Sequence, residues 1–467
     1  MSEEKTRSEL LKEQLFMKKE HTSVCIGEEG NAQADSFSEG YMNYLDCSKT
    51  EREAVETALE MAKAGGFTEF DKNVRYPAGS KVYLNNRGKS LILAVIGHKD
   101  IKDGVRISAA HVDAPRLDLK PNPLYEESEL AYFKTHYYGG IKKYQWTAIP
   151  LALHGVVVRK DGSKVSISIG ENEDEPKFVI TDLLPHLAAN QMRSTMAEGI
   201  KGETLNILIG SRPFDNTAGA DAVKLNIMNI LNEKYGIIEE DFLSAELEAV
   251  PAFKASDIGF DRSMIGAYGH DDRVCAYPAL MAILDCDEPD YTCITVLTDK
   301  EETGSEGNTG LDSKYLEYFV CDLAGMSGAD GREVLSNSKC LSADVNAAFD
   351  PNFPEVYEKK NTCFINGGVC ITKYTGSRGK GGTSDASAEF MGEIRSLLDS
   401  ENVCWQTGEL GKVDEGGGGT VAKYIAHLNV DVVDLGVPVL SMHAPFEIVS
   451  KTDVYMAYRA FLAFFNK

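Results

Sequence analysis

The second half of the sequence alternates apolar runs typical of buried strands with amphipathic runs typical of helices, and this alternation restricts the fold more than any other feature. Such a pattern is typical of a sheet covered by helices on both faces, because each element must bury its apolar side. The segments are YPALMAILD, CITVLTDKEE, KCLSADVNAA, SDASAEFMGEIRSLLD, NVCWQTGEL, TVAKYIAHLN and VDVVDLGVPVLSMHAP. We therefore predict an α/β domain in this half.

The first part of the chain continues the pattern, and the middle interrupts it. An amphipathic helix is expected to start at Ser48 or Thr50 and to stop at Gly66, and the strand-like segment GVRISAAHVDAP ends its apolar run at His111. Between residues 118 and 250 the pattern changes to short strand-like runs such as IPLALHGVVVRKDGSKVSISIG. A chain of 467 residues has room for two or three domains. We predict one domain split between residues 1–117 and 251–467, with a β-rich insertion at 118–250.

Charge and cysteine usage restrict the partners and the compartment. The formal net charge is -24 at pH 7, and nucleic acids and anionic membranes repel such a protein, so we expect neither as a partner. The start MSEEKTRSELLKEQ lacks the apolar core of a signal peptide, and no apolar run reaches the roughly 18 residues that span a bilayer. Ten cysteines without paired spacing favour reduced thiols and a cytoplasmic protein. The expected partner is a small molecule or a peptide.

Five short motifs place His, Asp and Glu directly after apolar runs. They are HVD at His111–Asp113, HDDR at His270–Arg273, KEET at Lys300–Thr303, SADV at Ser342–Val345 and SMHAP at Ser441–Pro445. Imidazole and carboxylate groups suit zinc and similar divalent ions, and a carboxylate shared by two ions leaves each ion with open positions for water and substrate. Each motif alone is commonly structural. Their joint occurrence at predicted strand ends of one domain indicates a two-metal site.

The motifs belong to a longer ordered series that covers nearly the whole chain. It comprises GYMNYLDCS, AAHVDAPRLDLKP, IPLALHG, LEAVPAF, GHDDR, the EE pair, SADV, TSDASAEF, GGGGT and DLGVPVLSMHAP. With this series the sequence resembles the M18 family of metallopeptidases, which includes aspartyl aminopeptidase and vacuolar aminopeptidase I. The resemblance implies a split catalytic α/β domain with a central mixed sheet flanked by helices, interrupted by a β-rich dimerisation domain.

The resemblance also implies the metal ligands, residue by residue. His111 and Asp344 match the ligands of one zinc ion, Glu302 and His443 match those of the other, and Asp271 matches the bridging carboxylate. The motif HDDR leaves Asp272 as an alternative bridge, although the family pattern favours Asp271. Two zinc ions per subunit are expected, and Co2+ or Mn2+ would suit the same ligands.

Three residues match catalytic positions of the family. Glu301 matches the general base, which takes a proton from the attacking water and later protonates the leaving amine. Asp113 matches a carboxylate that orients the imidazole of His111 and raises its basicity. His154 resembles a histidine that the inserted domain lends to a neighbouring subunit, where it would stabilise the tetrahedral oxyanion.

Two further segments are expected to contact the substrate. Lys373 matches a basic position near the substrate, with Arg378 and Lys380 as alternatives. The run GGGGT lacks the Lys-Ser/Thr ending of a phosphate loop, and we predict that Gly418 and Gly419 form a cradle of backbone amides for the substrate.

We therefore expect an aminopeptidase that releases the N-terminal residue from short peptides. A dimetal deacylase that cleaves another amide, and a non-catalytic assembly protein of the same fold, are the alternatives. The resemblance further implies a homo-oligomer built from dimers, which assemble in some members into a tetrahedral dodecamer. The sequence leaves open the preferred N-terminal residue, which is acidic in some members, the native metal, the physiological peptides, the exact oligomeric state and regulation.

Overall fold

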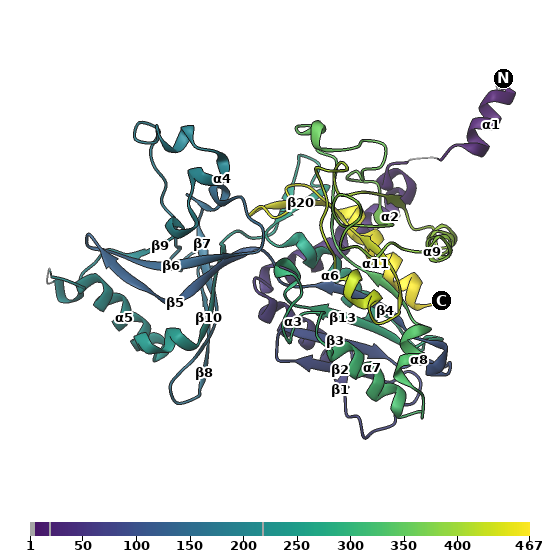
Figure 1. Ribbon diagram of the computed structural model, residues 1–467, viewed down its shortest axis with the longest axis horizontal. Coiled ribbons are helices and arrows are strands. Elements are labelled where there is room, and N and C mark those ends of the chain that lie inside the picture. The colour runs from purple at the N-terminus through teal and green to yellow at the C-terminus, as the bar shows by residue number, and fades with distance from the viewer. Residues whose placement is uncertain (1–4, 18–19, 217–218) are drawn as a thin grey trace.

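The computed structural model describes residues 5–17, 20–216 and 219–467 and shows two regions joined by a neck (Figure 1). We call residues 116–251 the inserted region and the remainder the main region. The main region contains a nine-stranded sheet. In spatial order its strands are β1 (Thr68–Glu69), β2 (Lys81–Asn86), β3 (Ser90–Val95), β13 (Cys293–Thr298), β4 (Arg106–His111), β14 (Lys339–Ser342), β18 (Asp431–Gly436), β16 (Val369–Thr372) and β17 (Trp405–Thr407).

The central strands of this sheet run in one direction. Strands β13, β4, β14 and β18 are mutually parallel, whereas β3 and β16 pair with them in the antiparallel direction, so the sheet is mixed. Every residue of β3, β4 and β13 is buried, as expected of central strands that are covered on both faces. Parallel strands end at the same edge of a sheet, and β4 ends at His111 as predicted.

Helices cover both faces of the main sheet. One face packs against α2 (Thr22–Cys47), α3 (Glu51–Ala64), α6 (His270–Leu284), α9 (Ala388–Ser400) and α11 (Lys451–Phe465). The other face packs against α7 (Tyr315–Gly325), α8 (Gly331–Ser336) and α10 (Ala422–Ala426). Alternate residues of β3 enter opposite cores, Leu91 and Leu93 on one side and Ile92 on the other. The predicted α/β fold with a central mixed sheet flanked by helices is confirmed.

Helix α3 begins after Thr50, one of the two expected starts, and ends before Gly66 as expected. Thr50 is the N-cap residue, and its side chain accepts a hydrogen bond from the backbone N–H of Glu53, whose side chain in turn accepts from the N–H of Thr50. The helix ends at Ala64, and Gly66 follows with φ of +87°, a conformation that favours glycine.

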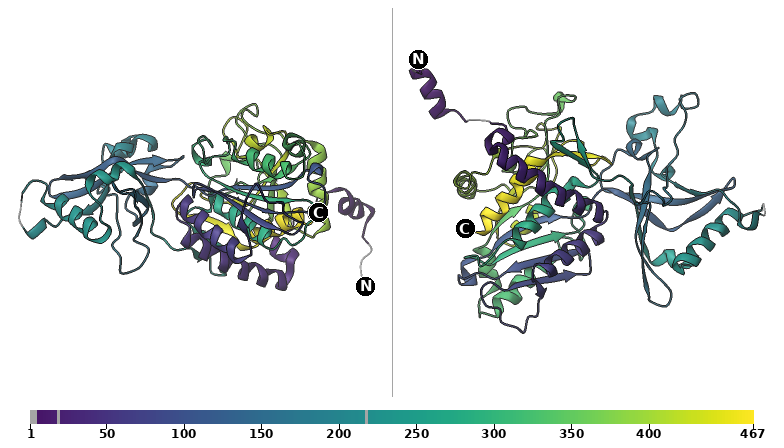
Figure 2. Two further views of the ribbon diagram at one scale, coloured as in Figure 1. Left: turned by 90° about the horizontal axis from the view of Figure 1, so that it is seen from below. Right: turned by 180° about the vertical axis from the view of Figure 1, so that it is seen from behind.

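The inserted region is built on an antiparallel sheet of six strands (Figure 2). In spatial order they are β8 (Lys164–Ile169), β7 (Leu151–Val158), β10 (Ala245–Pro251), β5 (Arg116–Glu127), β6 (Leu130–Tyr138) and β9 (Ile207–Gly210). Helix α5 (Ala222–Tyr235) packs on this sheet, and the fully buried Trp146 lies in a separate apolar core. The region therefore has its own sheet and its own core.

Short elements complete the chain. Strands β11 (Ser256–Ile258), β12 (Met264–Ala267) and β20 (Glu447–Ser450) form a small sheet, and β15 (Asn346–Ala347) pairs with β19 (Pro438–Val439). The helices α1 (Arg7–Leu15) and α4 (Met196–Gly199) lie near the N-terminus and in the inserted region. Within the described ranges, no helix is long and apolar enough to cross a membrane.

Candidate metal centre

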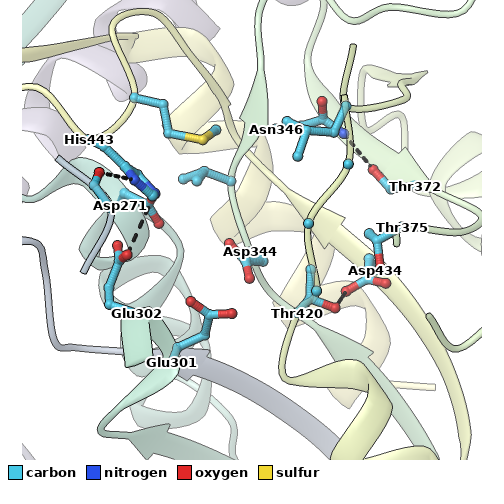
Figure 3. A pocket seen from close by; sticks show the side chains of 17 residues that line it. Asp271, Glu301, Glu302, Asp344, Asn346, Thr372, Thr375, Thr420, Asp434 and His443 are labelled. Carbon is cyan, nitrogen blue, oxygen red and sulfur yellow. Dashed lines mark hydrogen bonds and ion pairs between the residues drawn. The ribbon is translucent and has the colours of Figure 1, made fainter. Parts of the chain in front are cut away.

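Three neighbouring parallel strands deliver acidic and imidazole side chains to one edge of the main sheet. His111 is the last residue of β4, Glu301 and Glu302 follow β13, and Asp344 follows β14. Lys300, with φ of +70°, turns the chain out of β13 into a short 3-10 segment, Glu301–Thr303. Because of this turn, both glutamate side chains line the same cavity (Figure 3).

Asp271 and His443 reach the same place from outside the sheet. Asp271 lies in the first turn of α6, and His443 lies in the loop between β19 and β20. The two carboxylate oxygens of Asp271 lie 3.2 Å from Nε2 of His111 and 3.2 Å from Nε2 of His443. Nε2 of His443 is also 3.6 Å from a carboxylate oxygen of Glu302. Asp271 therefore lies between two imidazoles that face each other across it.

The donor atoms fit metal ions. Two sets of side chains could each hold an ion with ligand atoms within 4.8 Å of one another: His111 with Glu301 and Asp344, and His111 with Asp271 and Glu302. Nε2 of His111 and Oε1 of Glu302 are buried without a hydrogen-bond partner, which is costly unless a cation lies beside them. Imidazole nitrogen and carboxylate oxygen are ligands that zinc accepts.

The electrostatics of the cluster point the same way. Burial, with the negative charges of Asp113 and Asp271 nearby, raises the pKa of Glu301 to about 7. Burial and neighbouring carboxylates also raise the pKa values of Glu302 and Asp344 well above their ordinary range. Acids packed this closely repel one another when ionised, and a divalent cation among them would relieve that repulsion.

Asp113 and Asp272 are buried carboxylates that accept hydrogen bonds from the backbone of the cluster residues. Nδ1 of His111 donates a hydrogen bond of 3.0 Å to the backbone carbonyl oxygen of Asp113 and lies 3.3 Å from Oδ1 of its carboxylate. This carboxylate also accepts hydrogen bonds from the backbone N–H groups of Glu301 at 3.1 Å and Glu302 at 3.2 Å. Asp272 turns away from the cavity and accepts the backbone N–H of His111. Of the two aspartates that the sequence left as candidate bridges, only Asp271 faces both imidazoles.

Among the site residues that the sequence did not identify, Glu447 and Tyr138 contact the cluster of candidate ligands or its supporting carboxylate. Glu447, the first residue of β20, is buried and accepts the backbone N–H groups of Asp271 at 3.1 Å and His443 at 2.7 Å. Its position four residues after His443 was the available signal. Tyr138, at the end of β6, donates a hydrogen bond of 2.7 Å to Asp113. Nothing in the local sequence of Tyr138 marks this contact.

A cavity of about 400 Å³ opens beside the cluster. The predicted glycines 418 and 419 line it, together with Thr372, Thr375, Asn346 and Asp434 on the side away from His443 (Figure 3). Gly417, with φ of +125°, allows the glycine run to pass close to Gly376, because a Cβ there would collide with the carbonyl oxygen of Gly376. The run therefore forms one wall of the cavity with its backbone.

Two predicted residues, Lys373 and His154, lie away from the cluster. The ammonium group of Lys373 is 2.6 Å from the Asp385 carboxylate on an exposed loop, and Lys373 does not line the cavity. His154 is buried on β7, where its ring nitrogens lie 2.7 Å from Glu53 and 3.0 Å from Glu171. Within one chain, the structure therefore does not bring either residue to the cluster.

Known proteins share this architecture over almost the whole chain. The family model for aminopeptidase I zinc metalloproteases (M18) matches residues 44–465. A probable M18 family aminopeptidase 1 of Clostridium acetobutylicum is 50% identical over 439 residues, which cover 92% of this chain and 94% of that protein. Two crystal structures are similar, each covering 97% of this chain and 100% of its own: an M18 aminopeptidase from Thermotoga maritima (TM-score 0.93, 42% identity) and aminopeptidase I from C. acetobutylicum (TM-score 0.91, 45% identity).

The mixed sheet, the cluster at its edge and these similarities define a metallo-aminopeptidase. The chain belongs to the M18 family, the aminopeptidase I zinc metalloproteases. The family and the enzyme class that the sequence motifs predicted are thereby confirmed.

Proposed function

We propose that this enzyme hydrolyses the N-terminal peptide bond of short peptides with two zinc ions. His111 and Asp344 would hold one ion, Glu302 and His443 the other, and Asp271 both. The observation that carries this proposal is the position of Asp271, whose two oxygens each lie 3.2 Å from a different imidazole. When bound, the ions would polarise the scissile carbonyl and make water nucleophilic at neutral pH. Co2+ and Mn2+ would suit the same ligands.

Glu301 is the general base of this proposal. Its side chain lines the cavity and is 19% exposed, whereas that of Glu302 is 3% exposed and faces His443. The more accessible carboxylate can take a proton from the attacking water and deliver it to the leaving amine, and the more enclosed one is better placed as a ligand. The Asp113 carboxylate, which accepts the N–H of each glutamate, keeps both in place.

The lining of the cavity bears on substrate preference. Among the described residues that line it, none is Lys or Arg, and Lys373 points to Asp385 instead. A buried acidic side chain needs a cationic or hydrogen-bonding partner. We therefore place uncharged N-terminal side chains ahead of acidic ones as preferred substrates, with Thr372 and Thr375 as hydrogen-bonding groups. Backbone groups of Gly418 and Gly419 would bind the substrate main chain.

A homo-oligomer is part of the proposal. The stretch between β8 and β9 in the inserted region exposes a group of large apolar side chains at half or more of their area: Leu183, Leu184, Leu187, Met192 and Met196. Exposed apolar groups of this kind mark contact surfaces, and we assign this one to dimerisation. A yeast mApe1 dodecamer shares the fold at 21% identity with a TM-score of 0.75, which supports a further assembly of dimers. Light scattering at several concentrations would measure the assembly.

The oligomer would also decide the role of His154. Both of its ring nitrogens are occupied by carboxylates of its own chain. To stabilise an oxyanion in a neighbouring subunit, the ring would have to release one of them on assembly. The proposal for His154 therefore requires a rearrangement at the neck. All ten cysteines are free thiols, and we propose that the enzyme works in the cytoplasm.

The test compares the metal-free protein, the zinc-loaded protein and the zinc-loaded Glu301→Gln variant on peptides that begin with Asp, Glu, Leu or Lys. We expect zinc to restore activity, Leu to be cleaved faster than Asp, and Glu301→Gln to be at least about a hundredfold slower at unchanged zinc content. Glu306→Gln, an exposed glutamate of the same loop, is the matched control. Cleavage of no free-amine substrate despite two bound zinc ions would favour a deacylase, and absence of both zinc and activity would favour an assembly protein.

A further inference from the structure

One three-residue segment of the inserted region reaches the metal centre of the main region. Tyr138 is the last residue of β6, and Gly139 and Gly140 follow it. Strand β6 belongs to the six-stranded sheet, so this segment connects the inserted sheet directly to the candidate ligands. Its contacts involve both imidazoles of the centre, one through Asp113 and one directly.

Tyr138 acts on the first imidazole through Asp113. Its hydroxyl donates a hydrogen bond of 2.7 Å to Oδ2 of Asp113. Nδ1 of His111 donates to the backbone carbonyl oxygen of Asp113 at 3.0 Å and lies 3.3 Å from Oδ1 of the same residue, so both the backbone and the carboxylate of Asp113 contact this imidazole. Asp113 is fully buried, so its orientation depends on the few donors around it. Burial, followed by the charge of Asp113, raises the pKa of Tyr138 far above its ordinary value, so the phenol stays a donor.

Gly140 acts on the second imidazole directly. Its carbonyl oxygen accepts a hydrogen bond of 2.8 Å from Nδ1 of His443, which leaves Nε2 of that ring facing Asp271 and Glu302. A Cβ on Gly140 would lie 3.3 Å from Nδ1 of His443, and one on Gly139 would lie 3.1 Å from a carboxylate oxygen of Glu302. The two glycines therefore let the backbone approach the ligands closely.

The aromatic ring of Tyr138 is itself held in place. Arg116 lies opposite Tyr138 in the β5–β6 pair, and its guanidinium group lies 3.9 Å from the centre of the ring. Arg116 is buried and pairs with Asp118 at 2.8 Å and Glu248 at 3.0 Å, both within the inserted sheet. The hydroxyl is thus presented from a rigid support.

We propose that Tyr138 is a positioning residue for the metal centre. The segment Tyr138–Gly140 orients both imidazoles: that of His111 through Asp113, and that of His443 through the carbonyl oxygen of Gly140. The inference rests on the proposed two-metal site. It gives the inserted region a second task besides assembly. Partners that orient metal-bound imidazoles commonly affect metal affinity by about 10- to 100-fold.

The test measures zinc affinity by competition with a chromogenic chelator and the visible absorption spectrum of the Co2+-loaded protein. We expect Tyr138→Phe to weaken zinc binding by about 10- to 100-fold and to change the Co2+ spectrum, with circular dichroism of the metal-free protein unchanged. Tyr137→Phe, at the adjacent exposed tyrosine, should stay within about twofold of wild type. A zinc affinity of Tyr138→Phe within twofold of wild type, with an unchanged spectrum, overturns the inference.

Two further variants separate this inference from the proposed function and from a folding defect. In an Asp113→Asn background, Tyr138→Phe should weaken zinc binding less than it does alone, because both act on the same imidazole. Fully additive losses contradict the route through Asp113. Gly140→Ala presses on His443 and should weaken zinc binding, whereas Gly392→Ala, where a Cβ meets nothing within 4 Å, should not. If the wild-type protein binds no zinc, the two-metal site fails instead.

Discussion

The main region and the inserted region both contain a large sheet, but only the main sheet ends in a cluster of candidate metal ligands. In the main sheet, parallel strands β13, β4 and β14 end at one edge and bring His111, Glu301 and Asp344 together there. The inserted sheet is antiparallel, so its strand ends alternate between two edges, and exposed and less exposed residues alternate along β8. Parallel strands bring side chains from distant parts of the sequence together at one edge. Antiparallel strands divide their ends between two edges, and one face of the sheet can remain exposed.

Ion pairs connect the two regions at the neck. Arg116, on the inserted sheet, lies 3.4 Å from Glu51 of α3, and Lys89 of the main region pairs with both Glu51 and Glu246. His154 likewise pairs with Glu53 of α3 and with Glu171 of the inserted region. The two regions therefore differ in the side chains that their sheets bring together, and ion pairs connect them.

The largest effect is expected at Asp271, in the cluster at the edge of the main sheet. Asp271→Asn should lower kcat by at least about a thousandfold, because it weakens the carboxylate that faces both imidazoles, and metal ions contribute several kcal/mol to such reactions. Steady-state kinetics with metal analysis would measure this. Asp174→Asn, at an exposed position of the inserted region, should leave kcat unchanged. Comparable losses in both variants would remove the functional contrast between the regions.

Metal removal should affect the two regions unequally. The chain has two tryptophans, Trp146 in the core of the inserted region and Trp405 on β17 of the main region. Zinc at about 100 times its Kd stabilises the folded state by about 3 kcal/mol. In single-tryptophan variants, chelation should therefore lower the melting temperature reported by Trp405 more than that reported by Trp146. Equal shifts would show that both regions unfold as one unit.

Stability at the neck should depend on pH through His154. Burial lowers the pKa of this imidazole, but hydrogen bonds to Glu171 and Glu53 outweigh it and raise the pKa to about 9 from an ordinary 6.5. The stabilisation is fully present below pH 6.5 and is lost as the pH rises through 9. The cost of His154→Gln in unfolding free energy should thus shrink by about 3 kcal/mol between pH 6 and pH 10, as measured by urea denaturation.

The matched control for this titration is His186→Gln, at an exposed position of the inserted region. Its effect on unfolding free energy should be small at every pH. A pH-independent cost of His154→Gln would mean that the imidazole is neutral in the folded protein. His154 would then form no ion pair between the two regions.

The smallest effect is expected at Lys373. Its ammonium group pairs with Asp385, and its side chain is 44% exposed outside the cavity, so Lys373→Met should change kcat/KM on a peptide beginning with Asp by less than about threefold. Thr372→Val is the informative neighbour, because Thr372 lines the cavity and accepts a hydrogen bond of 2.8 Å from Asn346. A large loss of activity on acidic substrates in Lys373→Met would place this lysine at the substrate after all.

Local patterns predicted the elements on which the site depends. The start of α3 at Thr50 and the end of β4 at His111 follow from capping and apolar periodicity, which act over a few residues. Lys373, which was proposed from the family resemblance, shows what such local patterns do not decide. Thr372 ends strand β16, and successive residues of a strand point to opposite sides, so the neighbour of the predicted residue faces the cavity.

By itself, the sequence determined the class of fold and the family, because these depend on composition, periodicity and ordered motifs, and it offered candidate metal ligands. Only the tertiary structure decided which side chains meet. The position of Asp271 between two imidazoles, the contacts of Glu447 with Asp271 and His443 and the hydrogen bond from Tyr138 to Asp113 join residues far apart along the chain. Such contacts depend on strand order and on the direction of each side chain, and neither leaves a signal in the neighbouring residues.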